Sequence, residues 1–162
     1  MTLSAFPPEA RRSVALRVLG MLSSDDLPEI ALCLLELPGS PSAAALAGEG
    51  PRERAELFDA ALAELGLELP SRLEAARYLR LQVAREAARG DVRPRAAAEL
   101  IRDIYQEVEL DLPRGERVGS SLNVGEVIGL YYSFDGVESA SEFAQLEGEL
   151  LEALKTIAGE EG

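Results

Sequence analysis

Helix start and stop signals recur along this chain, and the segments between them repeat apolar residues every three to four positions. Prolines stand where helices would begin, at Pro8, Pro51 and Pro94, and glycines stand where two of them would end, at Gly66 and Gly90. A proline fits the first turn of a helix because its missing N–H is not needed there, and glycine adopts the left-handed conformation that ends a helix. The pattern therefore predicts an all-α protein.

Further helix starts are indicated by a capping residue that is followed three positions later by glutamate. These pairs are Asp26 with Glu29, Ser71 with Glu74, Asn123 with Glu126, and Ser139 with Glu142. The segment 124–134 is ambiguous, because its run of β-branched and aromatic residues is also typical of a strand. We favour a helix there, since one isolated strand would have no partner.

The chain has 162 residues, which suits one domain with a sizeable core. We expect a single-domain bundle of six or seven amphipathic helices over residues 1–158. Two segments rich in small and polar residues, 39–50 and 110–125, are expected to be flexible connections, and residues 159–162 a frayed tail. The expected helices cover 8–22, 26–37, 51–65, 71–89, a segment from 94, 127–134 and 139–158, with one short turn at 42–47.

Several chemistries are excluded by composition. The chain has no histidine and one cysteine, so it lacks histidine-based catalytic sets, imidazole metal sites and internal disulfides. We expect Cys33 to be a small buried core residue, because it lies among leucines. The apolar run 14–22 is too short to span a membrane. We therefore expect a cytoplasmic, non-enzymatic protein without cofactor or metal.

The formal net charge is −13, and it is concentrated in the last third of the chain. Residues 111–162 contain eleven acidic and three basic side chains. Such a balance repels nucleic acid and anionic lipid, and it attracts a basic protein partner. The alternative is that the charge only provides solubility. The arginines of 71–89 form no stripe, and we expect them to cover a solvated surface.

A candidate partner-binding surface combines aromatic and acidic residues of this last third. Tyrosines next to a polar loop and acidic side chains are typical of protein interfaces, although aromatic rings also complete cores. An adaptor subunit and a hydrolase that uses carboxylates with a bound metal are the alternative functions. The candidate partner-binding residues are Tyr131, Tyr132, Phe134, Glu147, Glu149 and Glu152.

Two segments resemble a recurring pattern in small bacterial proteins of unassigned function. They are AARYLRLQVAREAARGDVRPRAAAELIRDI (residues 75–104) and VIGLYYSFDGVES (residues 127–139). The pattern is an arginine-rich helix, a Gly-Asp turn, a helix that begins at proline, and an aromatic segment that ends in acidic residues. Some proteins of this kind are thought to be toxin-immunity proteins. The resemblance implies a bacterial interaction protein, such as an immunity or inhibitor protein, and it identifies no functional residue.

Overall fold

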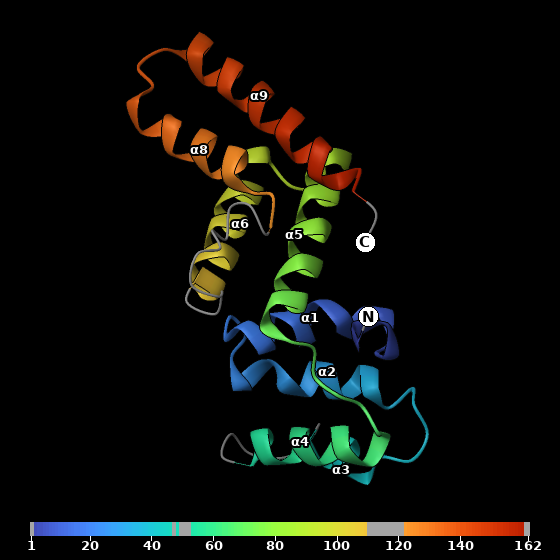
Figure 1. The fold of residues 1–162 in the computed structure, drawn as a ribbon. Helices are drawn as coiled ribbons and strands as arrows, with labels where there is room; N and C mark the ends of the chain where they lie inside the picture. Colours follow the sequence, from blue (N-terminus) through green and yellow to red (C-terminus); the bar gives the residue numbers. More distant parts are fainter. Residues whose placement is uncertain (1, 47, 49–52, 110–121, 161–162) are drawn as a thin grey trace. The chain divides into compact units, whose positions relative to one another are not determined.

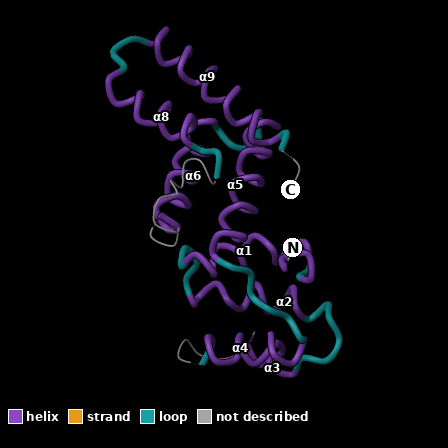
Figure 2. The backbone as a smooth tube through the Cα atoms, viewed as in Figure 1, coloured by secondary structure: helices purple, strands orange, loops and turns teal. Residues whose placement is uncertain are grey.

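The computed structural model describes residues 2–46, 48, 53–109 and 122–160, and all regular secondary structure within them is helical. Figure 2 shows helices joined by loops, without a strand in the described part. Eight α-helices are present there, against the six or seven expected, because the short turn predicted at 42–47 is a helix of its own. The predicted all-α class is thus confirmed for these residues.

The chain divides into two compact units, Met1–Ala75 and Ala76–Gly162, and the boundary lies inside one helix. The expectation of a single domain over residues 1–158 stays a prediction.

The first unit packs four α-helices (Figure 1). They are α1 (Pro8–Leu19), α2 (Leu27–Leu34), α3 (Pro41–Leu46) and α4 (Arg54–Leu65), with short 3-10 turns at Thr2–Ala5 and Ser24–Asp26. Helix α2 contacts α1, α3 and α4, and α3 packs along α4. The largest fully buried side chains of this unit include Phe6, Leu27, Ile30, Leu34, Leu46 and Phe58.

Helix α3 lies within the expected connection 39–50, at the place of the short helical turn predicted at 42–47. Ser40 caps this helix, because its hydroxyl accepts a hydrogen bond of 3.0 Å from the backbone N–H of Ala43. The carboxylate of Glu64 on α4 accepts three further bonds, from the Ser40 hydroxyl at 2.9 Å, the Ser42 hydroxyl at 2.6 Å and the Ser42 N–H at 3.1 Å. Leu46 is fully buried, so an apolar anchor accompanies these polar bonds.

Two of the predicted helix caps are present. The Ser139 hydroxyl accepts a 3.2 Å bond from the N–H of Glu142, and the Ser71 hydroxyl accepts a 3.2 Å bond from the N–H of Glu74. The Glu74 carboxylate does not complete a reciprocal box, because it accepts a 2.6 Å bond from the backbone N–H of Thr2 instead.

The other two predicted caps make no side-chain bond to their helices, although Asp26 does occupy the N-cap position of α2. Ser23 and Asp26 form a reciprocal capping box one turn before α2, so the Asp26 carboxylate is engaged there and makes no cap bond to α2. Val124 occupies the cap position of the later helix, and Asn123 has a positive φ of 51°. In both cases the chain uses the predicted capping residue for a different local bond or turn.

The second unit contains the helices that position the candidate site. They are α5 (Arg72–Arg89), which includes the boundary, α6 (Pro94–Val108), α8 (Gly125–Ser133) and α9 (Ala140–Ala158), with a 3-10 turn at Phe134–Gly136. Helices α8 and α9 lie side by side as an antiparallel hairpin, and α6 packs against both (Figure 1). The ambiguous segment 124–134 is therefore helical where it forms α8. Its apolar face is buried by α6 and α9 at Val127, whereas a strand there would lack a partner.

One α5 arginine departs from the expected solvated surface. Arg80 is 8% exposed, and its guanidinium donates to the backbone carbonyl of Leu122 and to the Glu160 carboxylate, the latter at 2.5 Å. The second Glu160 oxygen accepts a 2.7 Å bond from the Asn123 side-chain amide. Glu160, which we expected in a frayed tail, is thus held by α5 and by the residues before α8. The rest of that tail, 161–162, lies outside the described residues, as does 110–121 of the other expected connection.

Candidate functional site

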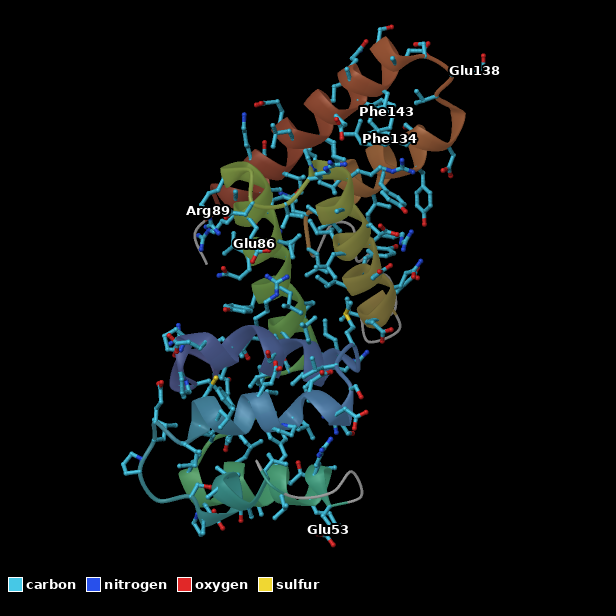
Figure 3. The ribbon with its side chains drawn as sticks, turned by 180° about the vertical axis from the view of Figure 1, so that it is seen from behind. Glu53, Glu86, Arg89, Phe134, Glu138 and Phe143 are labelled. Carbon is cyan, nitrogen blue, oxygen red and sulfur yellow. The ribbon has the colours of Figure 1, made fainter. Side chains whose placement is uncertain are left out.

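The aromatic residues after α6 gather on α8 and α9. Phe134 is buried and meets Phe143 edge to face, with 5.1 Å between ring centroids (Figure 3). Tyr131 is half-buried, and its hydroxyl accepts a 2.7 Å bond from Arg102 on α6. Tyr132 is 51% exposed. The three predicted rings therefore differ: one belongs to the core, one is fixed at its edge, and one faces solvent.

Arginines of α6 stack on these rings. The Arg95 guanidinium carbon lies 5.3 Å from the centroid of Phe134, and that of Arg102 lies 4.9 Å from the centroid of Tyr131. Both distances are in the range of cation–π attraction. Asp103 bonds Arg102 at 2.5 Å, which raises the pKa of that guanidinium. The contacts hold both guanidinium groups in defined orientations.

A third tyrosine extends this aromatic surface along α6. Tyr105 is half-buried, and its hydroxyl donates a weak 3.4 Å bond to Glu109. Burial raises the pKa of Tyr105, and the nearby Glu109 and Tyr132 raise it further. Tyr132 of α8 meets the neighbouring Tyr131 edge to face, with 5.5 Å between ring centroids.

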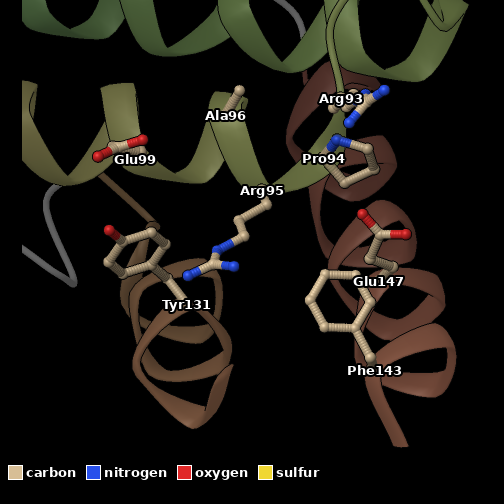
Figure 4. A pocket seen from close by; sticks show the side chains of 8 residues that line it. All are labelled: Arg93, Pro94, Arg95, Ala96, Glu99, Tyr131, Phe143 and Glu147. Carbon is tan, nitrogen blue, oxygen red and sulfur yellow. The ribbon is translucent and has the colours of Figure 1, made fainter. Parts of the chain in front are cut away.

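A cavity of about 570 Å³ opens where the first turn of α6 meets α8 and α9 (Figure 4). Arg95 reaches from α6 toward Tyr131, while Phe143 and Glu147 of α9 form the opposite wall (Figure 4). Among the described residues, Arg93 and Arg95 form no ion pair. The cavity is lined by Arg93, Pro94, Arg95, Ala96, Glu99, Tyr131, Phe143 and Glu147.

A separate groove of about 400 Å³ lies between α8 and α9, and we call it the acidic groove. Two of its three carboxylates have partners: Glu149 accepts a 2.8 Å bond from Gln145, and Glu152 pairs with Lys155 at 2.7 Å. Both partners are exposed, so these carboxylates stay accessible. The groove is lined by Glu126, Leu130, Glu149, Glu152, Ala153 and Thr156.

The structure divides the predicted acidic residues between these two places. Glu149 and Glu152 line the acidic groove together with Glu126, which the sequence analysis did not select. Glu147 lines the arginine-containing cavity instead, beside Tyr131. The other residues missed from the sequence are the arginines of α6. Pro94 predicts the start of a helix there, but it does not indicate which helices pack against that helix.

No metal centre or membrane span is found in the described part of the chain. No three Cys, Asp or Glu side chains there are close enough to hold a metal ion. No described helix is both long enough and apolar enough to cross a lipid bilayer.

The first unit exposes a small apolar surface on α2. Leu32 and Leu35 are 58% and 45% exposed. Cys33 beside them is half-buried, which corrects its expected place in the core; the buried positions of α2 are occupied by Leu27, Ile30, Ala31 and Leu34. Burial raises the pKa of the Cys33 thiol, and nearby glutamates raise it further, so the thiol is not activated.

Comparison of the chain with protein-family models, with curated proteins and with solved structures finds no match.

Proposed function

We propose that this chain is a non-enzymatic protein-binding module that holds a basic segment of a partner in the acidic groove between α8 and α9. The observation that supports this proposal is the groove itself. Glu126 comes from α8, Glu149 and Glu152 come from α9, and the apolar side chains of Leu130 and Ala153 lie between them. A basic segment with apolar residues at helical or alternating spacing would match both features.

The surrounding charge favours a cationic partner. Residues 122–160 contain eight acidic side chains and one lysine. Such a field speeds the encounter with a basic surface, while the individual exposed ion pairs add little affinity. The three groove carboxylates are not close enough to hold one metal ion. They suit several separate cationic side chains better than a single ion.

The exposed tyrosine of α8 would add affinity beside the charges. Tyr132 is half exposed and meets Tyr131 edge to face, and Arg102 stacks against Tyr131. Tyrosine and arginine are the residue types that most often dominate binding energy at protein interfaces. Because neighbouring contacts already orient these side chains, their burial by a partner costs less conformational entropy.

An immunity or inhibitor protein that blocks a basic effector fits this surface, and so does an adaptor subunit. The two roles differ in the partner and not in the groove. Within the proposal, the immunity or inhibitor role is preferred because an acidic surface can cover a basic active or nucleic-acid-binding face directly.

The test uses a defined basic probe, the peptide acetyl-Lys-Leu-Ala-Arg-Lys-Leu-Ala-Arg-amide, and maps its site by NMR. We expect amide shifts at Leu130 and Ala153 on addition of the peptide. Neutralising the groove with Glu126→Gln, Glu149→Gln and Glu152→Gln together should weaken binding roughly tenfold, since an exposed ion pair contributes about 0.5 kcal/mol.

The matched control removes the same charge elsewhere on the hairpin, with Asp135→Asn, Glu138→Gln and Glu142→Gln. These residues are exposed, and Figure 3 shows Glu138 at the turn between α8 and α9. The control triple should bind nearly as well as the wild type. Equal weakening by both triples would show that the general field, and not the groove, attracts the peptide, and the proposal would then fail.

A further inference from the structure

We propose that the cavity between α6, α8 and α9 is a second binding site, which takes a carboxylate attached to an aromatic group. The cavity and the acidic groove share no lining residue, so this inference does not depend on the proposed function. Its volume of about 570 Å³ lies in the range of ligand-binding clefts.

Two arginines that line the cavity form no ion pair among the described residues. Elsewhere in this unit, Arg80 pairs with Glu160, Arg89 with Asp91, and Arg102 with Asp103. Arg93 and Arg95 line the cavity without such an ion pair among the described residues. Since no described carboxylate forms an ion pair with either guanidinium, each of them attracts an anion that enters the cavity. They are therefore available to a carboxylate.

Stacking on an aromatic ring fixes one of these arginines while leaving its N–H donors free. Arg95 lies over the ring of Phe134 at 5.3 Å, and Phe134 is itself buried against Phe143. A guanidinium that stacks through its face keeps its N–H edge for hydrogen bonds, and this fork matches the two oxygens of a carboxylate. Because Arg95 is already ordered in the free protein, binding costs less side-chain conformational entropy.

The walls of the cavity are partly aromatic. Tyr131 and Phe143 line the cavity on opposite sides of the arginines, as Figure 4 shows, so a ring on the ligand would find aromatic neighbours beside the guanidinium groups. The cavity also contains two carboxylates. Glu99 lies 3.8 Å from Arg102, whereas Glu147 makes no ion pair among the described residues. Glu147 would repel the ligand, and its neutralisation should strengthen binding.

Two probes and one counter-probe test the site by NMR titration of the arginine side-chain N–H groups. Phenylacetate and the peptide acetyl-Glu-Phe-Glu-amide both present a carboxylate near a ring, and phenethylammonium presents the ring with the opposite charge. We expect the first two to shift Arg93 and Arg95 and the third to leave them unchanged. Tighter binding of the peptide would assign the natural source to a protein segment, and tighter binding of phenylacetate to a small molecule.

Variants make the result decisive. Arg95→Gln should weaken binding about tenfold, the fold-change expected when a hydrogen bond to a charged group is lost. Arg77→Gln on α5 removes the same charge from another exposed position and should have no effect. Glu147→Gln should strengthen binding. Equal binding of phenethylammonium, an unchanged Arg95→Gln variant, or weaker binding of the carboxylate probes by Glu147→Gln would each overturn the proposal, the last because Glu147 would then not repel the bound carboxylate.

Discussion

Glu160→Gln is expected to destabilise the second unit far more than its position near the end of the chain suggests. The Glu160 carboxylate accepts one bond from Arg80 at 2.5 Å and one from Asn123 at 2.7 Å. It therefore links the end of α9 to α5 and to the residues that precede α8. Glutamine keeps the size and one acceptor oxygen but removes the charge that balances the buried guanidinium.

The size of the effect follows from the exposure of the two side chains. Arg80 is 10% exposed and Glu160 is 31% exposed in their side chains. Breaking a fully buried ion pair costs about 3–5 kcal/mol, because a buried charge is left unbalanced, whereas an exposed pair contributes at most about 1 kcal/mol. Since Glu160 is partly exposed and the Leu122 carbonyl still accepts from Arg80, we expect a loss of about 2 kcal/mol.

Urea unfolding followed by far-UV circular dichroism at neutral pH measures this loss. A decrease of about 2 kcal/mol is a large part of the roughly 5–15 kcal/mol that stabilises a typical domain. The matched control is Glu138→Gln, the same substitution at an exposed site, which should change the free energy of unfolding by less than about 0.5 kcal/mol. If Glu160→Gln behaves like this control, Glu160 does not balance Arg80 and the assignment is refuted.

Two further predictions concern Glu64 and Tyr132. Hydrogen bonds from Ser42, and then from Ser40, lower the pKa of Glu64, so this contribution to stability is fully present above the pKa of the unfolded chain and is lost as the pH falls through the lower folded value. Thermal unfolding should therefore show Glu64→Gln to be less stable than the wild type at neutral pH, and a difference that persists unchanged in strong acid would contradict the pKa assignment. Tyr132→Ala should speed the dissociation of a bound partner while leaving the melting temperature nearly unchanged, because the ring is half exposed; a lower melting temperature with unchanged dissociation kinetics would place the ring in the core.

Helix positions in this chain could be predicted well because their signals are local. A proline at the first turn, a glycine after the last, and apolar spacing between them act within a few residues of each other. The predicted helices that begin at Pro8 and Pro94 begin there in the structure. A short helical turn was predicted where α3 lies, but its anchoring was not, because Glu64 lies 22 positions away from Ser42 and no local pattern indicates such a bond.

The caps illustrate the same limit at the level of single side chains. A capping pattern shows that a residue is able to bond the helix end, but a competing partner can take the bond. The Glu74 carboxylate bonds Thr2, which is 72 positions away in the sequence, and Asn123 bonds Glu160, which is 37 positions away. The buried position of Arg80 depends likewise on Glu160. Such long-range polar bonds become visible only when the helices are assembled.

The candidate site shows why nearness in sequence does not define a surface on a helix. Successive residues of α9 are about 100° apart around its axis, so Glu147 and Glu149 differ by about 200° and face nearly opposite sides. The structure accordingly places Glu147 with the arginines of α6 and places Glu149 with Glu126 of α8. One acidic cluster in the sequence thus belongs to two surfaces that are expected to bind ligands of opposite charge.

Charge removal at Glu149 should lower the affinity for a basic partner, whereas the same change at Glu147 should raise the affinity for an anionic ligand. Because the two surfaces share no lining residue, each substitution should change the affinity for its own ligand by the same factor in a double variant as in the single variant. A different factor in the double variant would indicate that α9 couples the two sites.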